Sequence, residues 1–170
     1  MKSCSLIFLL LICFCFIAQN ESNRGYIVKV GDDLPDLVLD MNDGSVLTNQ
    51  DLKGKVVVLQ FTGSWCSVCR REMPHLESRV WEKFKQKDFL LLGIDIKEPK
   101  EKVDAFIKKM EITYPIAYDP KGEIFSKFTL EGAGVTRNIV INKKGEIVFL
   151  TRLFEEAEFE KMIKKIKEII

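Results

Sequence analysis

Two cysteines stand three positions apart directly behind a continuous apolar run, in the stretch KVVVLQFTGSWCSVCRREMP, residues 55–74. The β-branched run Lys55–Phe61 is typical of a strand that is buried on both faces of a sheet. The apolar residues that follow, Met73, Leu76, Val80 and Phe84, recur every three or four positions, as on one side of a helix. The sequence therefore predicts a strand that passes directly into a helix, with Cys66 at or just before the first turn.

The expected position of Cys66 favours a reactive sulfur. The first turn of a helix has unpaired backbone N–H groups and the positive end of the helix dipole, and both stabilise an anion such as a thiolate. In such settings a cysteine pKa falls from about 8.5 to between roughly 3.5 and 7.5. Residues three apart on a helix lie about 5 to 6 Å from each other, which suits a disulfide. We expect Cys66 to attack a substrate disulfide and Cys69, one turn deeper and shielded, to resolve the mixed disulfide.

Strands and helices alternate along the rest of the chain, which indicates an α/β fold. Phe89–Ile96 is a second buried strand, and the order strand, helix, strand predicts a right-handed parallel crossover. The remaining pattern predicts a hairpin of Leu37–Leu39 and Ser45–Leu47 around Asn42–Gly44, a helix opened by Pro99 and running to Met110, strands at Arg137–Ile141 and Gly145–Thr151, and a last helix at Glu155–Ile170.

The N-terminus has the form of a secretory signal. One basic residue, Lys2, precedes the apolar run Leu6–Ala18, which is too short to span a bilayer comfortably. We expect a signal peptide at residues 1–18 and one domain at residues 19–170. Two alternatives stay open: a lipid anchor on one of the signal's cysteines, which are Cys4, Cys13 and Cys15, or an uncleaved membrane tether. All three outcomes place the domain outside the cytoplasm.

Beyond the signal only Cys66 and Cys69 remain, and in an exported protein thiols tend to be oxidised. Zinc would need a second pair of ligands, and that part of the chain has no other cysteine and only His75, so we expect no metal. A purely structural disulfide would close a very short loop and stabilise little. Residues 19–170 carry 25 basic and 25 acidic side chains, so no basic face indicates nucleic acid. No glycine-rich phosphate loop follows a strand, so we expect no cofactor.

Three segments resemble the extracytoplasmic thiol-disulfide oxidoreductases of the TlpA and ResA type, within the wider AhpC/TSA and redoxin group. They are VGDDLPDLVLDMNDGSVLTNQDLKGKVVVLQFTGSWCSVCRREMPHLE (Val30–Glu77), ITYPIAYDPKGEIFSKF (Ile112–Phe128) and GVTRNIVINKKGEIV (Gly134–Val148). The resemblance implies a thioredoxin fold, with a central mixed β-sheet flanked by helices and an N-terminal β-hairpin extension.

The resemblance also implies roles for residues of the first segment. Cys66 would be the nucleophile and Cys69 the resolving thiol, and Glu72 would help to control proton movement around the pair. A surface helix residue is the alternative for Glu72. Pro74 resembles the proline that locally opens the family's helix. Gln60 stands where thioredoxin has a buried aspartate, so a proton carrier would have to be Glu72 or water.

Substrate is expected to dock beside the disulfide on Trp65, which offers a flat surface, and on Val135 and Thr136. The family usually has a cis-proline at the position of Thr136. A cis bond before threonine costs about 2.5 to 4 kcal/mol, so we expect a trans Val135–Thr136 peptide. Peroxiredoxins also lack that proline and often have an arginine close by, and Arg137 is adjacent here.

The leading functional hypothesis is an exported thiol-disulfide oxidoreductase, a reductase rather than an oxidant. It would exchange disulfides with protein partners as a monomer and take electrons from a membrane redox donor. A peroxiredoxin-like thiol peroxidase is one alternative, although that pattern has a threonine three residues before its cysteine, and here Thr62 lies four and Ser64 two before Cys66. A non-catalytic docking module with the same fold is another.

Overall fold

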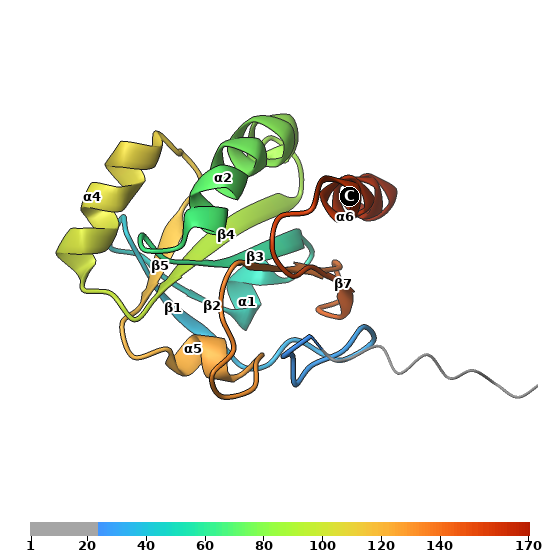
Figure 1. Ribbon diagram of the computed structural model, residues 1–170. Helices are drawn as coiled ribbons and strands as arrows, with labels where there is room; N and C mark the ends of the chain where they lie inside the picture. The colour runs from blue at the N-terminus through green and yellow to red at the C-terminus, as the bar shows by residue number, and fades with distance from the viewer. Residues whose placement is uncertain (1–23) are drawn as a thin grey trace, which may run out of the picture.

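A seven-stranded mixed sheet forms the centre of the computed structural model, which describes residues 24–170 (Figure 1). The expected signal peptide, residues 1–18, lies outside the described residues. The strands are β1 (Val38–Met41), β2 (Val46–Thr48), β3 (Val56–Thr62), β4 (Phe89–Ile96), β5 (Ile116–Asp119), β6 (Arg137–Ile141) and β7 (Ile147–Leu150). The helices are α1 (Asn49–Leu52), α2 (Ser67–Leu76), the π-helical segment η1 (Glu77–Trp81), α3 (Glu82–Phe84), α4 (Lys100–Met110), α5 (Glu123–Ser126) and α6 (Glu156–Ile169).

The strands lie in the order β2-β1-β5-β4-β3-β6-β7. The central pairs β3–β4 and β4–β5 are parallel, whereas β6 runs antiparallel to both β3 and β7. The expected parallel crossover, mixed sheet and N-terminal hairpin are therefore confirmed, the hairpin being β1 and β2. Strand β5 and the short helices α1 and α5 were not expected, because segments of four residues are too short to establish a hydrophobic period.

Two apolar layers cover the two faces of the sheet. All seven residues of β3 are buried, as expected of a strand enclosed on both sides. Val56 and Val58 pack in the layer beneath α2, α4 and α6, while Leu59 and Phe61 pack in the opposite layer with residues of α1 and α5. Figure 1 shows α2, α4 and α6 on one side of the sheet and α5 on the other. The central strands therefore place alternate side chains under the helix that carries the cysteines.

The helix after the cysteines changes from α-helical to π-helical hydrogen bonding three residues after Pro74. A proline has no N–H to donate, so it interrupts the regular hydrogen-bond ladder, and η1 follows directly after α2. The N–H of Glu77 donates to both Met73 and Pro74 carbonyls. Helix α2 continues past Pro74 to Leu76, so the departure from α-helical geometry lies at Glu77–Trp81 and not at the proline itself. The apolar side expected for this region stays buried, at Met73, Leu76, Val80 and Phe84.

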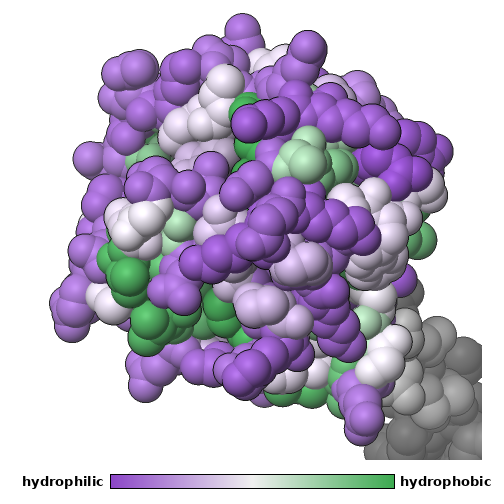
Figure 2. Space-filling model, turned by 90° about the vertical axis from the view of Figure 1, so that its left-hand side faces the viewer, coloured by the Kyte–Doolittle hydropathy of each residue, from purple (hydrophilic) through white to green (hydrophobic). Residues whose placement is uncertain are grey.

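Polar side chains cover most of the face seen in Figure 2, where hydrophobic surface gathers mainly at the lower left. The exposed large apolar side chains among residues 24–170 are Ile27, Val30, Val38, Val46, Trp65, Leu130 and Leu153. Of these, Trp65 adjoins the cysteine pair in sequence. No helix in the described part of the chain has both the length and the hydrophobicity needed to cross a bilayer.

Strand β4 buries a carboxyl group, that of Asp95, beside the start of α4. Both of its oxygens lack a hydrogen-bond partner within residues 24–170. Burial, and secondly the nearby Glu98, raise the pKa of Asp95 to about 8. Burial acts to raise the pKa of Glu98 as well, but hydrogen bonds from Lys102 and Ser64 hold it below its usual range. At neutral pH Asp95 therefore keeps its proton while Glu98 is ionised.

We expect Asp95→Asn to alter how stability depends on pH. The unfolded chain releases the Asp95 proton near pH 3.8, whereas the folded protein keeps it until about pH 8, so wild-type stability from this group falls as pH rises through that window. The variant lacks this fall. Relative to wild type, its free energy of unfolding should gain about 1 kcal/mol or more between pH 5 and pH 8, because one pKa unit corresponds to about 1.4 kcal/mol.

Urea unfolding at the two pH values measures this difference. Asp40→Asn, at an exposed position of β1, is the matched control and should show no such gain. Equal behaviour of the two variants would contradict a buried protonated carboxyl at Asp95.

Candidate active site

The cysteine pair lies where β3 passes into α2. Strand β3 ends at Thr62, and Cys66 is the N-cap residue of α2, with an extended backbone. Cys66 and Cys69 form a disulfide with their Cα atoms 5.2 Å apart. The backbone N–H of Cys69 donates to the Cys66 sulfur at 3.0 Å. The expected position at the strand-to-helix junction is confirmed, and the sulfur occupies the place of a helix-capping acceptor.

The two cysteine residues differ slightly in their exposed fraction. Cys66 is 6% exposed and Cys69 is fully buried, as expected of an outer and a shielded member of the pair. Both belong to the same large apolar cluster as Val135, the expected docking residue. Trp65 is 53% exposed. A flat aromatic surface therefore stands next to the outer cysteine in the chain.

Side chains of α2 and of the segment before α4 hold the loop that precedes Cys66. The N–H and the hydroxyl of Ser64 donate to the two carboxylate oxygens of Glu98, at 2.5 and 2.7 Å. The Arg70 guanidinium, on α2, donates to the Ser64 carbonyl at 2.6 Å, and Lys102, on α4, forms an ion pair with Glu98. Hydrogen bonds to an ionised acceptor are stronger than neutral ones, so Glu98 fixes this loop. Sequence reasoning missed Glu98, which lies 34 residues from its partner.

Glu72 is buried and accepts three hydrogen bonds from side chains. The donors are the Thr136 hydroxyl at 2.5 Å, the Asn138 amide at 2.7 Å and the Gln60 amide at 3.2 Å. The alternative of a surface helix residue is therefore wrong. Burial raises the pKa of Glu72 and outweighs the three hydrogen bonds, which act to lower it. Glu72 lies three residues after Cys69 on α2, which places it one turn along the same side of the helix.

The three donors reach Glu72 because β3 and β6 are neighbours. Gln60 on β3 pairs with Asn138 on β6 in the antiparallel register. Side chains alternate along a strand, so Thr136 and Asn138 point to the same face. Sequence reasoning identified Thr136 but missed Asn138. The signal for it was a polar amide two positions after Thr136, between Arg137 and the apolar end of the strand RNIVI.

The Val135–Thr136 peptide is cis, so the expectation of a trans bond is wrong. That expectation used the preference of isolated peptides. In the folded protein the contacts around Thr136 also count: its side chain is buried, its hydroxyl donates to Glu72, and its carbonyl accepts from the N–H of Leu153 at 3.1 Å. Threonine thus has the cis geometry that the resemblance gives to the family's proline.

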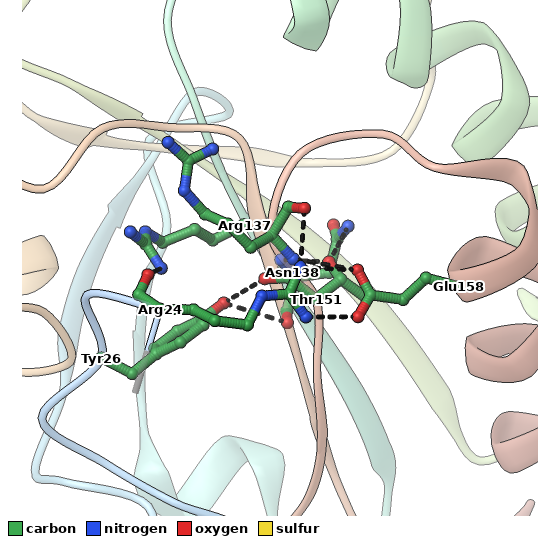
Figure 3. Close-up of polar contacts among 7 residues, drawn as sticks. Arg24, Tyr26, Arg137, Asn138, Thr151 and Glu158 are labelled. Atoms are coloured by element: carbon green, nitrogen blue, oxygen red, sulfur yellow. Dashed lines mark hydrogen bonds and ion pairs between the residues drawn. The ribbon is translucent and has the colours of Figure 1, made fainter. Parts of the chain in front are cut away.

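Arg137 lies between Thr136 and Asn138, so its side chain extends to the other face of the sheet. Its Nε donates to the Gly134 carbonyl at 2.9 Å and its Nη1 to the Arg24 carbonyl at 2.8 Å. The guanidinium also lies 4.5 Å from the ring centre of Tyr26. These contacts tie Arg137 to the N-terminal segment (Figure 3). Arg137 therefore does not favour the peroxidase alternative.

A further layer of hydrogen bonds supports Asn138 (Figure 3). The Thr151 hydroxyl oxygen accepts from both the backbone N–H and the side-chain amide of Asn138, at 3.0 and 2.9 Å. The Tyr26 hydroxyl donates to the Thr151 carbonyl at 2.6 Å. Buried polar groups with such partners hold a fixed orientation. The segment before β1 thus helps to fix the residue that donates to Glu72.

No group of three or more His, Cys, Asp or Glu side chains among residues 24–170 is arranged to hold a metal ion. Ser64, close before the cysteine pair in the chain, is hydrogen-bonded to Glu98, and Glu72, one turn after Cys69, is hydrogen-bonded to Thr136. This arrangement can carry out proton transfer and thiol-disulfide exchange, because it combines a disulfide at a helix N-terminus with a buried carboxyl group.

Comparison with known sequences gives a consistent result. The AhpC/TSA family model matches residues 30–150. Thiol-disulfide oxidoreductase ResA of Geobacillus kaustophilus is 30% identical over 141 residues, which cover 82% of this chain and 79% of the relative. ResA of Bacillus thuringiensis is 28% identical over 155 residues, covering 87% and 88%.

Two of the solved structures that share this fold are named for disulfide chemistry. A candidate protein disulfide isomerase from Bacteroides thetaiotaomicron is 50% identical, with a TM-score of 0.82 over 85% of this chain and 92% of that one. A candidate thiol:disulfide interchange protein DsbE from Chlorobium tepidum is 25% identical, with a TM-score of 0.75 over 84% and 98%. The chain belongs to the AhpC/TSA family, as a TlpA/ResA-like thiol-disulfide oxidoreductase with the thioredoxin fold.

Proposed function

We propose that this oxidoreductase is an extracytoplasmic reductase of protein disulfides, with Cys66 as nucleophile and Cys69 as resolving thiol. The observation that carries the proposal is the Cys66 sulfur at the N-cap of α2, where it accepts the Cys69 N–H at 3.0 Å. In the reduced protein the same N–H groups and the helix dipole stabilise a thiolate at this sulfur.

Reduction proceeds in two exchanges. The Cys66 thiolate attacks one sulfur of the substrate disulfide, which forms a mixed disulfide and releases the other substrate sulfur as a thiolate. The Cys69 thiol then gives its proton to the Glu72 carboxylate and attacks the Cys66 sulfur. This second step forms the Cys66–Cys69 disulfide and releases the substrate's remaining sulfur. Two electrons pass from the cysteine pair to the substrate.

The position of Glu72 supports its role as proton acceptor. It lies one turn after Cys69 on α2, and its burial raises its pKa above the ordinary glutamate value. A general base works best when its pKa lies near the working pH. An ordinary exposed glutamate would be a weaker acceptor for a thiol proton.

The substrate chain docks against Trp65, Val135 and Thr136 in this proposal. Trp65 supplies an exposed aromatic surface, and Val135 packs in the same apolar cluster as the disulfide. Thr136 is buried, and the hydrogen bond that its hydroxyl donates to Glu72 holds the docking segment in place. Named ResA relatives support protein disulfides as the substrate class.

The proposal also includes export of the protein and a supply of electrons to its disulfide. The apolar run Leu6–Ala18 directs the chain out of the cytoplasm, as a cleaved signal or as a tether, and leaves the domain at residues 19–170. A membrane redox donor then re-reduces the disulfide, and the protein acts as a monomer.

Substitution of the two cysteines should separate the two exchanges. We expect Cys66→Ser to abolish reduction of a disulfide-bonded model protein, because the remaining thiol of the pair, Cys69, is fully buried. We expect Cys69→Ser to stop after the first exchange and to accumulate a mixed disulfide. The measurements are the rate of thiol release and non-reducing electrophoresis. Wild-type rates in Cys66→Ser, or failure of the wild-type protein to reduce the substrate, would refute the proposal.

Glu72→Gln should slow the second exchange by about 10²-fold or more, since a positioned general base contributes about that factor. Glu72 accepts a proton only when ionised, so the wild-type rate falls as pH drops through the Glu72 pKa, which lies above the usual 4.5. The glutamine variant should lose this fall. Decay of a pre-formed mixed disulfide, followed from pH 4 to pH 9, measures both effects.

Glu82→Gln, at an exposed carboxyl of α3, is the control and should keep the wild-type profile. If Glu72→Gln and Glu82→Gln resolve the mixed disulfide equally fast, the proton passes to water instead of Glu72.

A further inference from the structure

Two more buried side chains continue the hydrogen-bonded row behind Glu72. The Tyr114 hydroxyl donates to the Gln60 side-chain carbonyl at 2.8 Å, and the Gln60 amide donates to Glu72 at 3.2 Å. Gln60 is fully buried, and Tyr114 and Glu72 are each 1% exposed. Tyr114 therefore reaches Glu72 through Gln60. The proposed function uses neither Gln60 nor Tyr114.

The surroundings of Glu72 suit one of its two protonation states. Its side-chain partners, Gln60, Thr136 and Asn138, all donate to it, which satisfies a carboxylate. A protonated carboxyl group has an O–H of its own and needs an acceptor. If Glu72 takes the proton of Cys69, one of its donors must become an acceptor.

Asn138 and Thr136 are poorly suited to that reversal. The Asn138 amide also donates to Thr151, and its carbonyl oxygen is buried without a partner within residues 24–170. Rotating this amide would break the hydrogen bonds that it now donates to Glu72 and to Thr151, and losing buried hydrogen bonds is costly. The Thr136 hydroxyl could accept from a protonated Glu72 only by giving up the hydrogen bond that it now donates to the same carboxyl group.

Gln60 can reverse, because its partner on the other side is a hydroxyl group. A tyrosine hydroxyl both donates and accepts, and a glutamine amide exchanges its N–H and C=O ends by rotation. With Glu72 ionised, Tyr114 donates to Gln60 and Gln60 donates to Glu72. With Glu72 protonated, Glu72 donates to the Gln60 carbonyl and the Gln60 amide donates to the Tyr114 oxygen. Both states have two hydrogen bonds between the three side chains, and in the second state the Tyr114 O–H turns away from Gln60.

We propose that Gln60 and Tyr114 are positioning residues that rotate as a pair and so give Glu72 a partner in both of its protonation states. No covalent bond changes in this rotation, and the one proton that moves is the one Glu72 takes from Cys69 and later returns. The inference rests on the proposed role of Glu72 as proton acceptor.

Of the side chains in this hydrogen-bonded row, Glu72 is the one that titrates. Burial, with added effects of Glu72 and Glu77, raises the pKa of Tyr114 well above its usual value, so Tyr114 stays protonated. Glu158 of α6 acts on Glu72 electrostatically, and Cys69 lies one turn before Glu72 on α2. On the next strand Asp95 pairs with Thr62, two residues beyond Gln60. A probe of the row must therefore distinguish glutamate from aspartate.

The test is a pH titration of the oxidised protein labelled with ¹³C at the glutamate side-chain carboxyl, with Glu72→Gln used to assign the Glu72 signal. We expect Gln60→Met to raise the Glu72 pKa by about one unit, because the ionised form loses a charge-assisted donor. We expect Tyr114→Phe to lower it, because the protonated form then leaves the Gln60 N–H groups unpaired, which costs more than an unpaired carbonyl. In the Gln60→Met background, Tyr114→Phe should have no effect.

Thr62→Val is the matched control: Thr62 is buried on the same face of β3 and donates to the Met73 sulfur, and its loss should leave the Glu72 titration unchanged. If Gln60→Met does not fold, Gln60→Asn replaces it in the same cycle, because the shorter amide cannot bridge the two partners. A Tyr114→Phe shift that is absent, or equal in both backgrounds, would overturn the inference.

The titration reads the Glu72 carboxyl directly and does not depend on turnover. Suppose that the Glu72 pKa shifts as expected but Glu72→Gln resolves the mixed disulfide at the wild-type rate. The paired rotation is then sustained, and the catalytic role of Glu72 is refuted. The two failures are therefore distinguishable.

Discussion

The hydrogen bond from the Cys69 N–H to the Cys66 sulfur fixes the arrangement on which the site depends. Strand β3 is buried on both faces and ends at Thr62, so the chain turns within a few residues to begin α2 at Ser67. The outer sulfur therefore caps the helix. Residues three apart then follow on one side of α2, first Cys69 and next Glu72. A single helix thus carries the nucleophile, the resolving thiol and the carboxyl group.

Burial of Glu72 has a cost that the sheet offsets. A carboxyl group removed from water is unfavourable unless it is hydrogen-bonded, and Gln60, Thr136 and Asn138 supply those bonds from the face beneath α2. These donors lower the pKa of Glu72 while its burial raises it, and burial has the larger effect. The net effect is a carboxyl group whose pKa lies above the ordinary glutamate value.

The sequence predicted the parts of the structure that depend on local patterns. Strand β4 has the bounds that its apolar run indicated, and the position of Cys66 followed from the adjoining strand and helix. The partners of Glu72 were not predictable in this way, because Asn138 lies 66 residues away and reaches it only through the pairing of β6 with β3. The cis geometry at Thr136 was missed because a rule for isolated peptides was applied to a residue with buried tertiary contacts.

The thiol pKa of Cys66 in the reduced protein tests the central claim most directly. Its rate of alkylation by iodoacetamide is followed against pH, with peptide mapping to separate Cys66 from the other cysteines. We expect a pKa below the value of about 8.5 for a free cysteine, in the range of roughly 3.5 to 7.5, and a slower reaction at the buried Cys69. A Cys66 that titrates near 8.5, or that stays unmodified at every pH, would contradict an activated nucleophile at the start of α2.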